Sequence, residues 1–119
     1  MKWIDSCVKT IEEDKVDLQI VVVDNNSSDD TVNYIRSNFP EIIVLPQKTN
    51  FGFSGANNIG YEYAKSVSAD YIYLLNQDTL SYPNTIEKLI NIYSKDITIG
   101  VVSPIHLSSD SSVLDKKFE

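Results

Sequence analysis

The sequence predicts an α/β protein with a mainly parallel sheet, and two alternating patterns lead to that prediction. Short runs of apolar, largely β-branched residues alternate with longer segments in which apolar residues recur every three or four positions. Strands that alternate with helices form right-handed βαβ units, in which successive strands run parallel. A chain of 119 residues is long enough for one core, so residues 1–119 are predicted to form a single domain.

The first element is predicted to be an amphipathic helix over Trp3–Ile11. Its apolar residues have the spacing i, i+3, i+4, i+7, which places them on one face. These residues are Ile4, Cys7, Val8 and Ile11. The next segment, Leu18–Val23, is an apolar run bounded by charged residues, and it predicts a buried strand.

A second helix is predicted to follow that strand. Ser27 or Ser28 is expected to be its N-cap residue, because a serine hydroxyl can accept a hydrogen bond from the first turn. Asp29 and Asp30 would then occupy the first turn, where the helix dipole favours negative charge. The helix is predicted to end at Pro40, which disfavours helical geometry in the residue before it.

The rest of the chain repeats the alternation. Strands are predicted at Ile42–Leu45, Tyr71–Leu75 and Ile99–Val102, each of which is a short apolar run. A third helix is predicted to start near Ser54. Pro83 suits the first position of a fourth helix, since its fixed φ is already helical. Beyond this, the segment around Ser108 to Ser112 is polar and is expected to be a loop or a frayed tail.

Composition and charge exclude several classes of protein. The net charge of −7 argues against a nucleic-acid partner, because phosphate backbones require clustered Lys and Arg. An acidic protein can still bind a nucleotide diphosphate when a divalent cation mediates the contact. The single cysteine, Cys7, excludes an internal disulfide and a cysteine-based zinc site. No apolar run approaches the ~20 residues of a membrane span. The N-terminus has no signal-peptide pattern, so a cytoplasmic location is expected.

Polar residues follow two of the predicted strands at the point where each strand ends. Asp24 ends the first strand, and Asn76-Gln77-Asp78 follows the third. Ligands of parallel sheets bind outside the carboxyl ends of the strands. If both strands belong to one such sheet, Asp24 and Asp78 share one rim, and that rim is the predicted site.

Each polar segment suits a particular ligand group, and each also has a purely structural interpretation. Asp24 offers a carboxylate for a ribose or base edge, or it caps the turn into the next helix. The glycines and asparagines of Asn50–Gly60 let a backbone approach a ligand closely, or they form a tight loop with a helix cap. Asn76 and Asp78, two positions apart, can both point toward Mg²⁺ or Mn²⁺, or they form an ordinary polar turn.

The order and spacing of three segments, Val23–Ser27, Asn50–Gly60 and Tyr73–Thr79, resemble those of the family 2 glycosyltransferases. The closest resemblance is to the rhamnosyltransferase-like branch, in which the usual Asp-x-Asp becomes Asn-x-Asp. It extends from about Trp3 to Leu107, which is nearly the whole chain. No single motif is specific, but three in this order are strong evidence.

The resemblance implies a Rossmann-like GT-A fold, which is a three-layer α/β/α sandwich with a mainly parallel sheet. It also implies a UDP- or dTDP-sugar donor, a divalent cation (Mg²⁺ or Mn²⁺) and an inverting transfer. The acceptor would be a saccharide or a lipid-linked molecule in cell-surface polysaccharide synthesis. The full enzyme would then associate peripherally with the inner face of the membrane.

The resemblance also assigns roles to particular residues of the donor site. The nucleoside would contact Asp24, while Asn50, Gly52 and Asn58 would shape the floor of the pocket. The metal would be held by Asp78, with Asn76 as its weaker partner. The full set of substrate-binding residues is Asp24, Asn26, Asn50, Gly52, Asn58, Asn76 and Asp78.

Two departures from the family suggest a fragment truncated at both ends. Family members open with an apolar strand that lies between those represented here by Leu18–Val23 and Tyr71–Leu75, and this chain opens with a helix. The chain also ends soon after Pro104, before the region that supplies the acceptor site and the catalytic base. We therefore identify no catalytic residue, and we expect the donor-binding features without the transfer machinery.

Two alternatives remain open on the sequence alone. A response-regulator receiver module would fit the length and the acidic strand end at Asp24. A receiver, however, has an acidic pair after its opening strand and a lysine at a late strand end, which Val101–Pro104 lacks. The second alternative is a non-catalytic remnant whose exposed sheet edges pair with another copy, giving a homodimer.

Overall fold

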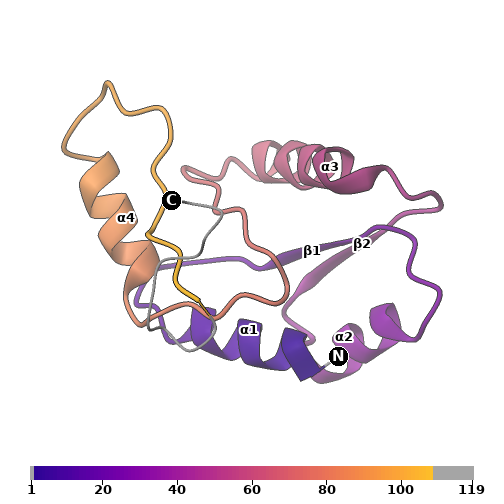
Figure 1. The fold of residues 1–119 in the computed structure, drawn as a ribbon. Coiled ribbons are helices and arrows are strands. Elements are labelled where there is room, and N and C mark those ends of the chain that lie inside the picture. The colour runs from indigo at the N-terminus through magenta and orange to yellow at the C-terminus, as the bar shows by residue number, and fades with distance from the viewer. Residues whose placement is uncertain (1, 109–119) are drawn as a thin grey trace.

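The computed structural model describes residues 2–108, which form four helices and one two-stranded sheet (Figure 1). The helices are α1 (Lys2–Glu12), α2 (Thr31–Asn38), α3 (Gly52–Ser66) and α4 (Thr85–Tyr93). The strands β1 (Val21–Asp24) and β2 (Ile43–Pro46) are parallel, and Asp24 lies opposite Pro46. No helix in this part of the chain is long and apolar enough to cross a membrane.

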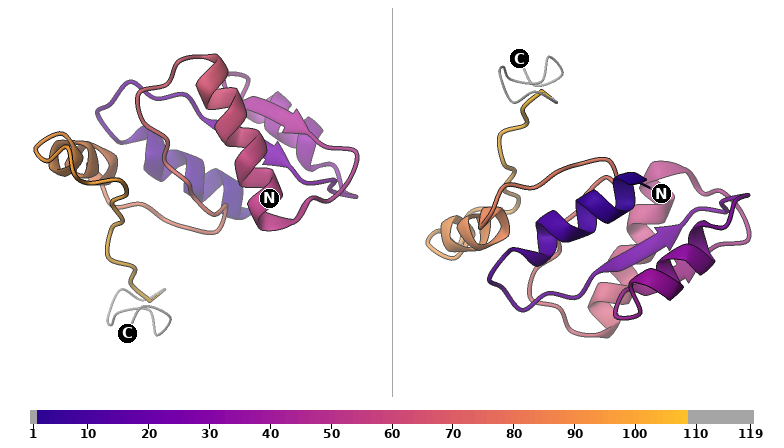
Figure 2. Two further views of the ribbon diagram at one scale, coloured as in Figure 1. Left: turned by 90° about the horizontal axis from the view of Figure 1, so that it is seen from above. Right: turned by 90° about the horizontal axis from the view of Figure 1, so that it is seen from below.

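The sheet lies between helices on both faces, as the α/β prediction requires. Seen from above, α3 crosses over the strands, and seen from below, α1 and α2 lie on the opposite face (Figure 2). All four predicted helices are confirmed, with shifts of a few residues at their ends. In particular, α3 begins at Gly52 and α4 begins at Thr85, two residues after Pro83.

Helix α1 contributes to two hydrophobic clusters, and its predicted apolar face is confirmed. Ile4 and Val8 pack with Ile35 of α2 beneath the sheet. The other two residues of that face, Cys7 and Ile11, pack with Ile86 of α4 and with the partly buried side chains of Tyr73 and Leu75. One helix therefore ties the sheet to α4 and to the segment that precedes it.

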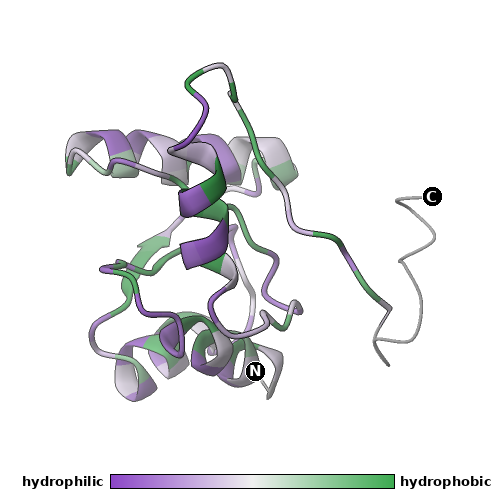
Figure 3. Ribbon diagram, turned by 90° about the vertical axis from the view of Figure 1, so that its left-hand side faces the viewer, coloured by the Kyte–Doolittle hydropathy of each residue, from purple (hydrophilic) through white to green (hydrophobic). Residues whose placement is uncertain are grey.

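The prediction of strands at Tyr71–Leu75 and Ile99–Val102 is wrong for this structure. Neither segment forms a backbone ladder within the described residues. The side chains of Tyr73 and Leu75 pack on α1, but within residues 2–108 no strand pairs with their backbone. After α4 the chain is extended and carries exposed hydrophobic stretches (Figure 3), with Val101 88% exposed. Apolar composition favours a strand, but a strand also needs a partner for its backbone.

One edge of β1 is paired and the other is not. The sheet therefore has two strands, where the predicted three-layer sandwich has four. Ile43 N–H donates to the Ile20 carbonyl, and Gln47 N–H donates to the Asp24 carbonyl. Because alternate residues of a parallel strand face opposite edges, the peptide groups of Val21 and Val23 face away from β2. No backbone hydrogen bond within residues 2–108 reaches them there. Dimerisation through a free sheet edge stays a prediction.

The predicted serine N-cap of α2 is also wrong. The N-cap position belongs to Asp30, whose side chain makes no capping hydrogen bond, so Asp29 precedes the first turn. The Asp29 carboxylate accepts hydrogen bonds from Thr31 N–H and from the Thr31 hydroxyl, and these bonds lower the pKa of Asp29. Ser27 N–H instead donates to Asp24 Oδ2 at 3.2 Å. The backbone N–H of Ser27 therefore belongs to the turn after β1, which ends before α2 begins.

A distant carboxylate caps α4. Asp14, which is 7% exposed, accepts hydrogen bonds from Ile86 N–H (2.9 Å) and Glu87 N–H (3.2 Å). The N-cap residue itself, Asn84, has a left-handed φ of 61° and makes no side-chain cap. Helix N–H groups at the first turn have no partner within the helix, so Asp14 satisfies two of them from the loop after α1.

We expect Asp14→Ala to lower the free energy of unfolding by about 1 to 2 kcal/mol, because both N–H groups lose their acceptor. Urea denaturation followed by circular dichroism measures this change. The matched control is Asp17→Ala, which removes an exposed carboxylate three residues away. Equal stabilities of the two variants would show that the cap contributes nothing.

Candidate functional site

A cavity of about 350 Å³ opens at the carboxyl end of β1. Its walls come from the start of α1, the end of β1, the loop before α2 and the turn after Leu75. The residues that matter below are Trp3, Asp24, Asn25, Asp29 and Gln77. This is the end of the strand at which the sequence predicts a site.

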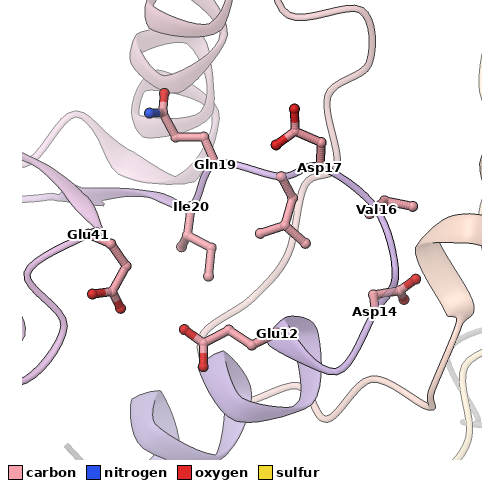
Figure 4. A pocket seen from close by; sticks show the side chains of 8 residues that line it. Glu12, Asp14, Val16, Asp17, Gln19, Ile20 and Glu41 are labelled. Atoms are coloured by element: carbon pink, nitrogen blue, oxygen red, sulfur yellow. The ribbon is translucent and has the colours of Figure 1, made fainter.

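A second cavity, of about 450 Å³, lies at the opposite end of β1. Figure 4 shows the carboxylates of Glu12 and Glu41 directed toward the same space, beneath Ile20. Asp14 also lines it but is engaged in capping α4. This cavity lies at the amino end of the strand, whereas ligands of parallel sheets bind outside the carboxyl ends. We therefore place the candidate site in the first cavity, although it is the smaller one.

Asp24 is the last residue of β1, and its side chain closes the turn that follows, as the structural interpretation expects, while its contact with a nucleoside stays a prediction. Its side chain is buried, and the residue is 6% exposed. One carboxylate oxygen closes the turn by accepting a hydrogen bond from Ser27 N–H. The same residue lines the cavity. A buried carboxylate held in this way is a fixed acceptor for an N–H or O–H group of a ligand.

Hydrogen bonds from Asn25 bring the Asn50–Gly52 loop to this end of β1. Asn25 Oδ1 accepts from Phe51 N–H at 2.8 Å. Asn25 Nδ2 donates to Asn50 Oδ1 at 2.8 Å and to the Gly52 carbonyl at 3.1 Å. The predicted site residues Asn50 and Gly52 therefore lie beside the cavity, although they do not line it.

Two other predicted residues lie away from the cavity walls. Asn58 is exposed on α3, about two turns from its start, and it does not line the cavity. Asn26 is also exposed, and its left-handed φ of 69° turns the chain just after Asn25. The structure brings neither side chain to Asp24.

The segment Asn76–Asp78 forms a turn, closed by a hydrogen bond of 3.1 Å from Thr79 N–H to the Asn76 carbonyl. Gln77, at its centre, lines the same cavity as Asp24. Asp78 is exposed and lies on the same turn. The sequence predicts that Asp78 shares a rim with Asp24. In the structure, the residue of this turn that lines the cavity with Asp24 is Gln77.

Helix α1 holds this turn from below. The Cys7 thiol donates to the Asn76 carbonyl at 3.7 Å. Burial raises the pKa of the Cys7 thiol, and the negative charge of Asp78 raises it further. The absence of a strand at Tyr71–Leu75 therefore does not leave the turn unattached.

The described residues contain no cluster of three or more acidic, histidine or cysteine side chains that could hold a metal ion. Mg²⁺ in nucleotide sites is commonly held by one or two carboxylates, with substrate phosphates and waters completing its coordination. The carboxylate of Asp78 and the amide oxygen of Asn76 offer hard oxygen donors of that kind. The donor set therefore fits a cation shared with a ligand, not a closed protein cage.

Trp3 and Asn25 line the cavity and were missed by the sequence reasoning. Trp3 is 64% exposed although it lies on α1, because it falls outside the helix's buried stripe. That mismatch, a large aromatic residue outside the apolar face, is a signal the sequence does carry. Asn25 carried no such signal beyond its position next to Asp24.

Residues 2–118 match the family described as Glycosyl transferase family 2. The chain belongs to that family. This confirms the resemblance found in the sequence and argues against the receiver-module alternative. Cation use is common in the family, but it does not identify the metal used here.

Curated relatives carry glycosyltransferase names. The SPbeta prophage-derived glycosyltransferase SunS of Bacillus subtilis (strain 168) is 33% identical over 122 residues, covering 92% of this chain and 27% of the relative. The dTDP-rhamnosyl transferase RfbG of Shigella flexneri is 35% identical over 97 residues, covering 75% of this chain and 33% of the relative. This family 2 chain thus spans about a third or less of each relative's length.

Proposed function

We propose that this family 2 chain forms the donor-binding part of a glycosyltransferase of the GT-A fold. Its ligand would be a UDP- or dTDP-sugar bound with Mg²⁺ or Mn²⁺. The observation that carries the proposal is the cavity at the carboxyl end of β1, where buried Asp24 and the turn containing Gln77 meet. Family membership supports the same class of ligand.

The nucleoside is the part of the donor that suits the cavity. Its volume of about 350 Å³ is at the lower end of the range for small-molecule sites. Asp24 would accept a hydrogen bond from a base N–H or a ribose hydroxyl, and Trp3 would offer an aromatic face to the base. Because Asp24 and Asp29 both line the cavity, its charge favours the uncharged nucleoside over the phosphates.

The diphosphate would lie outside the cavity, toward the turn of Asn76–Asp78. Asp78, with Asn76 as a weaker partner, would hold the divalent cation there. Such a cation neutralises the charge that develops on the diphosphate leaving group during sugar transfer. Since Asn replaces the first acid of the usual Asp-x-Asp, the protein contributes one negative charge fewer to this contact.

The proposal concerns donor binding by this chain. We assign the general base to no residue between 2 and 108, and the acceptor, a saccharide or lipid-linked molecule, would contact other parts of the enzyme. The name of the Shigella flexneri relative makes a dTDP-linked sugar the first donor to test.

The test uses the intrinsic fluorescence of Trp3, the one tryptophan in the sequence. We expect titration with dTDP or UDP to change this fluorescence saturably, and more strongly when Mg²⁺ is present, because Trp3 lines the cavity. Mg²⁺ alone serves as the control titration, and isothermal titration calorimetry gives the affinity independently. A folded chain that binds neither nucleotide with Mg²⁺ or Mn²⁺ would overturn the proposal.

A further inference from the structure

We propose that Asn25 is a positioning residue, which fixes the side-chain amide of Asn50 with its NH₂ group directed away from the protein donors, so that it can donate to a phosphate or sugar oxygen of the donor. This inference rests on the proposed donor binding. It concerns a residue that is not among the predicted site residues, and it assigns Asn25 a role through its neighbour instead of a direct contact with the donor.

The side chain of Asn25 makes three hydrogen bonds to the Asn50–Gly52 loop. Asn25 uses both ends of its amide, accepting from Phe51 N–H at 2.8 Å and donating to Asn50 Oδ1 and the Gly52 carbonyl at 2.8 Å and 3.1 Å. All three bonds join the end of β1 to the start of α3. They connect residues 25 to 27 positions apart in the chain.

Two hydrogen bonds fix the orientation of the Asn50 side-chain amide. Its Oδ1 accepts from Asn25 Nδ2 and also from Gly52 N–H, each at 2.8 Å. Two donors on the oxygen fix which end of the Asn50 amide faces the protein. The NH₂ end then points away from these donors, and it makes no hydrogen bond to the described residues. An amide NH₂ offers two donors to a phosphate or sugar oxygen.

The Asn50–Gly52 loop has little conformational freedom to compensate for a lost hydrogen bond. Gly52 has a left-handed φ of 71°, which residues other than glycine rarely adopt. At Gly55, one turn into α3, an added Cβ would lie 2.6 Å from the Cβ of Phe51. The loop is therefore packed tightly against its own helix. Loss of the Asn25 bonds would leave Asn50 Oδ1 with the single bond from Gly52 N–H, so the orientation of the Asn50 amide would be less fixed.

The chemistry requires an amide at position 25. An aspartate would keep the acceptor for Phe51 N–H but would lose both donors. Its charge would then face two acceptors, Asn50 Oδ1 and the Gly52 carbonyl, and repel them. Alanine would lose all three bonds. Asn25→Asp is therefore expected to disturb Asn50 at least as much as Asn25→Ala.

The experiment is a double-mutant cycle of Asn25→Ala and Asn50→Ala, with dTDP affinity in Mg²⁺ as the readout. Each single variant is expected to weaken binding by about 5- to 10-fold, the cost of one or two lost hydrogen bonds. The double variant should bind no more weakly than the weaker single one, because Asn25 acts through Asn50. Additive losses would overturn the proposal, as would a loss of thermal stability with unchanged affinity.

Two further measurements separate this inference from the proposed function. Asn91→Asp, on an exposed position of α4, adds the same charge as Asn25→Asp far from the cavity, and its dTDP affinity should match that of the wild-type chain. Amide hydrogen exchange at Phe51 and Gly52 should accelerate in Asn25→Ala without any nucleotide. If the wild-type chain binds no nucleotide, the proposed function and the donor-positioning role both fail. Faster exchange in Asn25→Ala would then show only that Asn25 holds the Asn50–Gly52 loop in place.

Discussion

Asp24→Ala is expected to weaken the binding of dTDP and UDP by at least about tenfold. The variant removes a buried carboxylate at the end of β1 that accepts from Ser27 N–H and lines the cavity. A hydrogen bond to a charged group contributes about 1.5 to 3 kcal/mol, and the ligand donor would be left without its acceptor. That cost corresponds to a loss of roughly 10- to 150-fold in affinity. Tryptophan fluorescence and calorimetry both measure it.

Asp24→Asn tests the same point with less risk to folding. Asparagine keeps an oxygen for Ser27 N–H but removes the charge, so weaker binding should persist while thermal stability stays close to that of the wild-type chain. The matched control is Asp17→Asn, which makes the same change on an exposed residue near the opposite end of β1. Unchanged affinity in both Asp24 variants would remove Asp24 from the site.

Local patterns in the sequence predicted the elements whose formation depends on local spacing. The stripe of α1 is an example, because the i, i+3, i+4, i+7 spacing places residues on one face whatever surrounds the helix. The failures at Tyr71–Leu75 and Ile99–Val102 have the opposite cause. Their composition favours strands, but a strand forms only beside a partner, and the presence of that partner is a property of the whole chain.

The same distinction applies to the site. The rule that ligands bind at the carboxyl ends of strands predicted one rim for Asp24 and the turn of Asn76–Asp78. Gln77 of that turn does line a cavity with Asp24, although Tyr71–Leu75 forms no strand, and ligand binding there stays a prediction. The three bonds of Asn25 could not be predicted, because their partners lie more than 20 positions away and depend on how the Asn50–Gly52 loop folds back. The serine N-cap of α2 was predicted wrongly because the helix begins later than expected, at Thr31, which leaves Asp30 at the N-cap position.

Asp78→Ala is expected to remove the dependence of nucleotide binding on Mg²⁺. In the wild-type chain Mg²⁺ should strengthen dTDP binding, because a cation between the carboxylate and the diphosphate offsets the repulsion between two anions. Without that carboxylate, the affinities with and without Mg²⁺ should converge, a loss of about tenfold or more in the presence of the metal. Calorimetric titrations in Mg²⁺ and in EDTA measure the difference.

The exposure of Asp78 makes this result easy to interpret. An exposed residue makes little contribution to the core, so Asp78→Ala should change the free energy of unfolding by no more than about 0.5 kcal/mol. Asp70→Ala, which removes another exposed carboxylate, is the control for the loss of one negative charge. If Mg²⁺ still strengthens binding in Asp78→Ala, the cation is held elsewhere. Because Asp24 acts on the nucleoside and Asp78 on the diphosphate, only the Asp78 variant should lose the metal effect while retaining the metal-free affinity.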